Sequence, residues 1–157
     1  NQLAIDLLDL FWELSIEHDI DPVVVYCQSM KETGFMKFGG VLDASFHNTC
    51  GLKVTAGGDN YDPNAHKRFD TWSKGIIAQC EHLCLYAGVA GYPLSEPIDP
   101  RHFAWITGTA ANVENLSGKW AGGTYGESLL KMCQEVINTK IEVTDADKIN
   151  MIRKIIE

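Results

Sequence analysis

The chain is 157 residues long and 45% hydrophobic, which is enough to bury one core and too little to expect two. Its formal net charge of −8 argues against a nucleic-acid partner, because affinity for phosphate backbones comes largely from lysine and arginine. No stretch approaches the roughly 20 apolar residues of a membrane-spanning helix, so we expect no membrane insertion. We therefore expect a single monomeric domain over residues 1–157. Because the chain opens at Asn1, without an initiator methionine or a signal peptide, we expect it to be part of a longer or processed protein.

The first part of the chain carries two helical patterns. Apolar residues recur at helical spacing over residues 3–17, which predicts a first helix. Asp21 followed by Pro22 is typical of an N-cap with proline in the first turn, and the apolar run at 23–31 predicts a buried second helix. Gly34 is expected to end that helix.

Residues 35–69 have a different composition, rich in glycine, asparagine and aspartate. Within this segment, residues 50–55 are the best strand candidate and are followed by a Gly-Gly-Asp-Asn turn. We expect a small lobe at about 36–69, built on a β-hairpin and inserted into a helical body. Clefts form where two such parts meet.

The rest of the chain is helical in pattern. The expected helices or helical turns lie at residues 72–86, 101–106, 113–116, 125–138 and 139–157. Thr71 or Asp70 is expected to cap the first of these, and Gly88 to close it. The last helix could dock on the body or lead into another domain. The expected fold class is therefore mainly α (α+β), a helical body with a small hairpin lobe.

The five cysteines are odd in number and lack the dense spacing of a disulfide framework. We expect mostly free thiols, and neither a metal nor a cofactor. Cys80 and Cys84 lie one helical turn apart, but no second Cys/His pair completes a tetrahedral zinc site. Core packing explains this pair better, because cysteine is among the most often buried residue types.

Glu32 is the strongest candidate functional residue. It is a lone carboxylate at the end of an apolar helical run, beside Phe35 and at the mouth of a loop. Partial burial there would raise its pKa toward the working range of a general acid. A glutamate at a helix C-terminus is unfavourable for the helix dipole, which favours a functional reason over a simple solvated position.

A carboxylic acid of this kind suits glycoside hydrolysis, in which one acid protonates the leaving oxygen and a second group stabilises the oxocarbenium-like centre. Asp62, or next to it Asp59, could face Glu32 from the turn-rich lobe as that second group. The alternative for Asp62 is structural, because aspartate before proline commonly opens a turn.

Aromatic residues in loops could supply stacking faces for a sugar. Trp120 and Tyr125 are the preferred candidates, because they lie in the polar, glycine-rich frame 117–126. The alternative is a tight helix start, with Thr124 as its cap and Trp120 as a buried anchor.

Four segments taken together, 30–35, 48–53, 65–76 and 119–126, resemble the glucosaminidase family of peptidoglycan hydrolases, glycoside hydrolase family 73. Members of that family have a lysozyme-like fold, and the resemblance extends roughly over residues 3–136. Met-Lys-Glu-Thr-Gly-Phe at 30–35 is similar to the family's catalytic segment, which implies the general-acid role for Glu32.

The other matched segments imply further roles. Asn-Thr-Cys-Gly-Leu-Lys at 48–53 resembles the family's Asn-x-Phe-Gly-Ile-Lys signature, with Cys50 in place of the usual aromatic residue. The segment 119–126 is similar to the one that supplies a cleft tyrosine. The expected catalytic residues are Glu32, Asp62 and Tyr125. The expected substrate-binding residues are Phe35, Asn48, Lys53, Asp59, His66 and Trp120.

The resemblance implies an endo-β-N-acetylglucosaminidase that cuts the β-1,4 bond between GlcNAc and MurNAc in the bacterial cell wall. Its partner would be the glycan strands of peptidoglycan. Its mechanism would be retaining, inverting or substrate-assisted. A lytic transglycosylase or muramidase on the same fold, and a non-catalytic wall-binding module, are the alternatives. The expected location is extracellular or in the cell wall, as a secreted autolysin or a phage lysin.

Overall fold

The computed structural model describes residues 1–140, and this part of the chain is mainly helical. Its α-helices are α1 (Gln2–Asp6), α2 (Leu8–Glu17), α3 (Pro22–Glu32), α4 (Trp72–Ala87) and α5 (Tyr125–Asn138). Short 3-10 helices lie at Ala44–Phe46, Pro63–Ala65, Ala104–Ile106 and Val113–Leu116. The mainly α fold class is therefore confirmed. None of the helices in residues 1–140 is both long and apolar enough to cross a membrane.

The expected helix ends are present where capping residues specify them. The Asp21 carboxylate accepts a hydrogen bond from the Val23 amide at 2.8 Å, at the start of α3. Thr71, rather than Asp70, caps α4. Gly88 ends α4 in the left-handed conformation, at a φ of +75°, which glycine adopts without steric cost.

Two expected helices differ in extent from the prediction. The helix expected at 3–17 is interrupted at Leu7, which separates α1 from α2. The one expected at 101–106 is reduced to the single turn Ala104–Ile106. The helix expected at 139–157 lies outside the described residues, apart from 139–140, which follow the end of α5.

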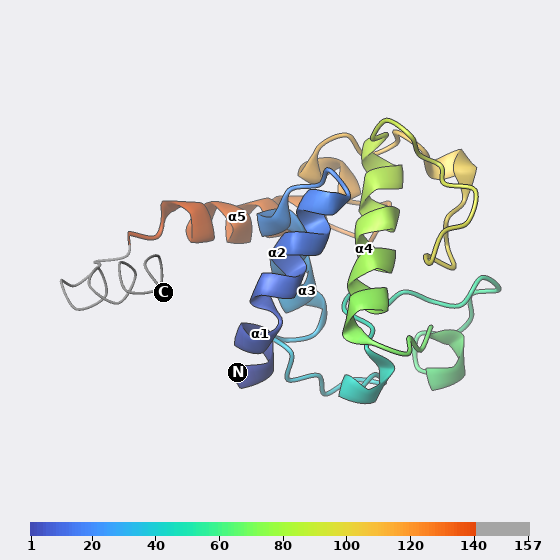
Figure 1. The fold of residues 1–157 in the computed structure, drawn as a ribbon, viewed down its shortest axis with the longest axis horizontal. Coiled ribbons are helices and arrows are strands. Elements are labelled where there is room, and N and C mark those ends of the chain that lie inside the picture. The colour runs from blue at the N-terminus through green and yellow to red at the C-terminus, as the bar shows by residue number, and fades with distance from the viewer. Residues whose placement is uncertain (141–157) are drawn as a thin grey trace, which may run out of the picture.

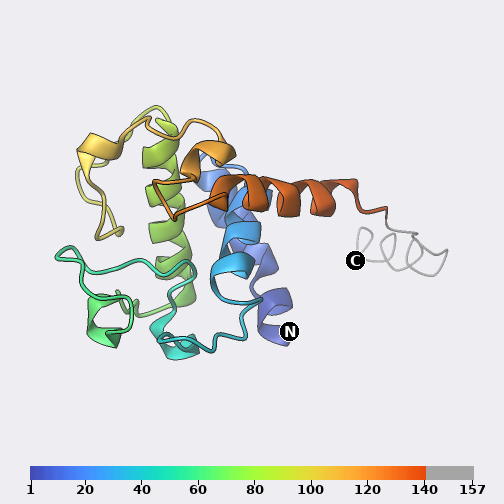
Figure 2. The same ribbon diagram turned by 180° about the vertical axis from the view of Figure 1, so that it is seen from behind.

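Helix α4 is the central element of the body. It runs alongside α2 (Figure 1), and α5 crosses α3 at a steep angle when the molecule is seen from behind (Figure 2). The main core contains the buried side chains Phe11, Leu14, Val25, Met30, Ile76, Leu83, Leu85, Leu129 and Cys133, which come from α2, α3, α4 and α5. The loop that joins α3 to α4 lies beside the first turn of α4 (Figure 1).

The hairpin expected in this loop is not present in the described chain. Residues 50–55 form no strand, and pairing is limited to one antiparallel bridge between Lys53 and His66, flanked by backbone hydrogen bonds of 2.8 and 3.0 Å. Gly51 and Gly57 both have positive φ values, near +73° and +72°, which turn the backbone out of the extended conformation. The lobe at 36–69 is therefore a compact irregular loop.

Asn48 supplies hydrogen bonds that a sheet would otherwise supply. Its side chain is fully buried, and Nδ2 donates to the carbonyls of Leu52 and Lys67, both at 2.8 Å. Its Oδ1 accepts from the Leu52 amide at 3.0 Å. One amide thus joins the two arms of the loop and satisfies backbone groups in both.

The lobe and the helical body touch at Gly75, in the first turn of α4. A Cβ atom on Gly75 would lie 1.8 Å from the His47 carbonyl oxygen, so only glycine permits this approach. The start of α4 is thereby fixed against the segment that carries Asn48.

We expect Gly75→Ala to lower the free energy of unfolding by about 1–3 kcal/mol, because the added methyl group must displace backbone. Gly122→Ala is the matched control, since nothing lies within 4 Å of a Cβ at that position. Urea denaturation followed by circular dichroism would measure both. Equal stability of the two variants would contradict the close approach.

Candidate active site

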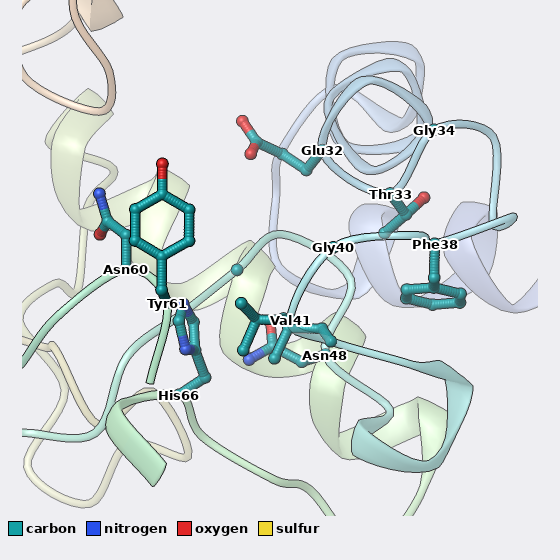
Figure 3. Close-up of a pocket in the computed structure, with 12 residues that line it drawn as sticks. Glu32, Thr33, Gly34, Phe38, Gly40, Val41, Asn48, Asn60, Tyr61 and His66 are labelled. Carbon is teal, nitrogen blue, oxygen red and sulfur yellow. The ribbon is translucent and has the colours of Figure 1, made fainter. Parts of the chain in front are cut away.

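A cavity of about 480 Å³ lies between the end of α3 and the loop at 38–66. Its lining residues include Glu32, Thr33, Phe38, Val41, Leu42, Asn48, Asn60, Tyr61 and His66. Figure 3 shows the Glu32 carboxyl group at the edge of α3, pointing to the side on which Asn60 and Tyr61 lie. Within residues 1–140, Glu32 is the single carboxylate that lines this cavity.

The end of α3 holds Glu32 in a fixed position. The Thr33 hydroxyl donates to the Ser29 carbonyl at 2.7 Å and accepts from the Met36 amide at 2.9 Å. Gly34 follows with a φ of +58°, and the chain turns sharply away from the helix axis. Glu32 therefore stands at the last helical position with its side chain directed out of the turn.

Tyr125 reaches Glu32 from the other end of the chain. It is the first residue of α5 and is buried, and its hydroxyl donates a short hydrogen bond to Oε1 of Glu32. The ammonium group of Lys31 lies 5.5 Å from the centre of the Tyr125 ring. The structure thus brings together two of the three residues expected to be catalytic.

The pKa of Glu32 is raised above its usual value, mainly because the surrounding protein removes water from the carboxyl group. Hydrogen bonds from Tyr125 and Trp120 and the charge of Lys31 oppose that shift. Burial also raises the pKa of Tyr125, so its hydroxyl keeps its proton and acts as a donor. Glu32 as a whole residue is exposed, so its carboxyl group reaches the cavity although the surrounding protein partly removes its water.

Buried amides lie one turn below Glu32. Gln79 on α4 donates from Nε2 to the Val25 carbonyl at 3.0 Å and to the Gln28 side-chain oxygen at 2.9 Å. Its own oxygen accepts from the Thr49 hydroxyl at 2.7 Å. This network connects α3, α4 and the lobe beneath the cavity.

The two candidate aspartates are engaged in turns. Asp62 accepts from the Asn64 amide at 2.8 Å and caps the turn Pro63–Ala65, and Asp59 accepts from the Tyr61 amide at 2.7 Å. Neither is among the residues that line the cavity. The structure therefore does not bring Asp62 to Glu32, and the catalytic role of Asp62 remains a prediction. The hydrogen bonding of Asp62 fits the alternative role, in which the aspartate opens a turn.

The expected substrate-binding residues are divided among three places. Asn48 and His66 line the Glu32 cavity, although the polar atoms of Asn48 are used within the loop. Lys53 and Trp120 line a second, smaller hollow. Phe35 is 54% exposed and lies against α5, outside the Glu32 cavity.

Two lining residues, Asn60 and Tyr61, were not among the preferred sequence-based candidates. Tyr61 belongs to the loop aromatics that the sequence offers as stacking faces, but Trp120 and Tyr125 were preferred to it. It is 85% exposed and follows a Gly-Gly-Asp-Asn turn, and an exposed aromatic residue in a polar turn is the signal that could have favoured it. Nothing in the sequence distinguished Asn60.

The cysteines are buried, and all five have free thiols. Cys80 and Cys84 are fully buried on α4, which confirms their expected place in the core. Burial raises the pKa of the Cys50 thiol well above its usual value, so Cys50 stays protonated and is a poor nucleophile. Residues 1–140 contain no cluster of three or more potential metal ligands.

Comparison with known proteins adds one relative. An uncharacterized protein of Borreliella burgdorferi is 30% identical over 115 residues, which cover 73% of this chain and 53% of the relative. The chain thus spans about half the length of that protein. No family model and no solved structure matches the chain.

Removal of the Tyr125 hydroxyl should change the titration of Glu32. Because this hydroxyl stabilises the ionised carboxylate, we expect Tyr125→Phe to raise the pKa of Glu32 further. Titration of the Glu32 side chain by carbon-13 NMR would measure the shift. Tyr61→Phe is the control, since Tyr61 also lines the cavity but has no influence on that pKa. An unchanged or lowered pKa in Tyr125→Phe would show that the bond is absent in solution.

Proposed function

We propose that this protein is a peptidoglycan hydrolase of lysozyme-like fold, an endo-β-N-acetylglucosaminidase that cuts the β-1,4 bond between GlcNAc and MurNAc. The observation that carries the proposal is the pairing of Glu32 with Tyr125 at the edge of a cavity of about 480 Å³. The resemblance of segments 30–35, 48–53 and 119–126 to family 73 glucosaminidases supports it.

Glu32 would act as the general acid. Its raised pKa favours the protonated form relative to an ordinary carboxyl group, and that form would give its proton to the glycosidic oxygen as the bond from that oxygen to the anomeric carbon breaks. The carboxylate that remains is stabilised by the hydroxyl of Tyr125, which already donates to it. When water adds to the anomeric carbon, the same carboxylate can take up the proton that the water releases, which restores the acid.

The positive anomeric carbon also needs a group that stabilises it. Since Glu32 is the single carboxylate that lines the cavity in residues 1–140, the geometry favours attack by the substrate's own N-acetyl group. Asn60, Tyr61 and His66 lie where they could orient that group (Figure 3).

The same observation favours a second candidate, a lytic transglycosylase. Such an enzyme also depends on one glutamate, but a hydroxyl of the muramic acid itself attacks the anomeric carbon and leaves an anhydro end. Its products are lighter by one water than those of a hydrolase. We infer peptidoglycan strands as the substrate in either case, and a site of action outside the cell or in the wall, as a secreted autolysin or a phage lysin.

Glu32→Gln should abolish cutting of purified cell wall, with a loss of at least about 100-fold, because the amide cannot deliver the proton. Glu13→Gln, an exposed position on α2, is the control and should retain activity. Mass spectrometry of the released muropeptides would identify the bond and the end group. Residual activity in Glu32→Gln close to wild type would refute the proposal. Equal wall binding by both proteins without any cutting would indicate a non-catalytic module instead.

Asp62→Asn tests the second carboxylate. The amide keeps an oxygen for the turn, so the fold should be preserved, and from its position outside the cavity we expect less than about a twofold change in rate. Initial rates on the same cell wall would measure it. A loss as large as that of Glu32→Gln would show that the lobe closes and brings Asp62 to the substrate.

A further inference from the structure

A second hollow of about 190 Å³ lies beside the Glu32 cavity, between the loop at 50–53 and the segments that carry Arg101 and Lys119. Lys53 also lines it, so three cationic side chains meet there, together with His82. No aspartate or glutamate is among its lining residues in the described part of the chain. This concentration of positive charge stands out in a protein with a formal net charge of −8.

The three cations have no acidic partner. Within residues 1–140, none of Lys53, Arg101 and Lys119 forms a salt bridge. Lys53 donates to the Gly58 carbonyl at 2.5 Å, and Arg101 donates to the Thr55 carbonyl at 3.3 Å, so both are held by neutral oxygens. Their charges remain available to an anion.

Asp99, the carboxylate that pairs with His82, already has hydrogen-bond partners. Asp99 is 2% exposed and lies beneath the hollow, where it pairs with Nδ1 of His82 at 2.7 Å and with Nδ1 of His102 at 3.3 Å. It also accepts from the Arg101 backbone amide at 2.8 Å. Asp99 therefore fixes His82 and the start of the 101 segment, and its carboxylate oxygens already accept bonds from the two imidazoles and the Arg101 amide.

The hollow and the proposed active site share a lining residue. Gly51 lines both the hollow and the Glu32 cavity. Trp120 lines the hollow and packs edge-on against His82, with 5.2 Å between the ring centres. On the side of the Glu32 cavity, a hydrogen bond from Trp120 lowers the pKa of Glu32. A group bound in the hollow would lie one indole ring away from the acid.

We propose that this hollow, the cationic subsite, binds a carboxylate of the peptide stem that the substrate carries on its muramic acid units. This inference rests on the proposed function and adds a determinant of substrate choice. A neutral sugar needs no cation, whereas a stem carboxylate gains charge-assisted bonds from Arg101 and Lys119.

Binding is tested with small probes, L-alanyl-D-glutamate and its fully amidated analogue, on the Glu32→Gln protein. The acid should shift the NMR signal of the Trp120 indole N–H, and the amide should not. The double variant Arg101→Gln, Lys119→Gln should bind the acid about 100-fold more weakly, as expected for the loss of two charged hydrogen bonds. Lys37→Gln, Lys74→Gln removes the same charge from exposed positions and is the control.

Activity is tested with intact cell wall and with the same wall after chemical amidation of its carboxyl groups. Wild type should have a several-fold higher KM on the amidated wall, and the double variant should not distinguish the two walls. Equal binding of acid and amide, tighter binding of glycerol 3-phosphate than of the acid, or an unchanged double variant would overturn the subsite. Failure of wild type to cut either wall would instead refute the proposed function, because the binding titration does not depend on cutting.

Discussion

The buried side chain of Gln79 holds the parts of the site in register. It bonds to α3 through Val25 and Gln28, and to the lobe through Thr49, while it stands on α4. A buried amide that lost one of these partners would leave polar groups without water or protein, at a cost of about 1–3 kcal/mol each. The relative positions of α3, α4 and the lobe are therefore coupled, and the cavity forms where they meet.

The electrostatics of the site follow from this packing. Burial raises the pKa of Glu32 and so stabilises the protonated carboxyl group. Hydrogen bonds from Tyr125 and Trp120 lower that pKa, because they stabilise the ionised form. The surroundings of Glu32 thus stabilise both of the states that a general acid must pass through. Trp120 also forms a wall of the cationic subsite. One aromatic side chain thus separates the proposed acid from the proposed anion site, and small movements of the 117–126 segment would affect both.

The lobe shows how a loop can be ordered without a sheet. Asn48 bonds to backbone groups of both arms, and Gly75 lets the first turn of α4 approach the segment beside it. The prediction of a strand at 50–55 was wrong for two reasons. Glycines in this segment have positive φ values, and the buried side-chain amide of Asn48 takes backbone hydrogen bonds that a strand partner would need. The turn composition of this segment was informative, but the strand pattern was not.

Local chemistry in the sequence determined where helices start and stop. Asp21 with Pro22, Thr71 and Gly88 are specified by capping and backbone conformation, which depend on neighbouring residues alone. The same local logic placed Glu32 at a helix end. The encounter of Glu32 with Tyr125, 93 residues away, was suggested by a family resemblance and decided by the packing of α5 on α3.

The turn role of Asp62 could be predicted from the sequence, because aspartate before proline commonly opens a turn, and Asp59 and Asp62 each bond to an amide only two residues along the chain. The cationic subsite could not be predicted in this way, because it depends on which side chains the tertiary fold brings together. Segments such as 50–53 and 119–120 line one hollow although they are far apart in the sequence. The sequence determined the capped helix ends and the place of Glu32 at one of them, because these depend on neighbouring residues, and the tertiary packing decided which side chains face Glu32.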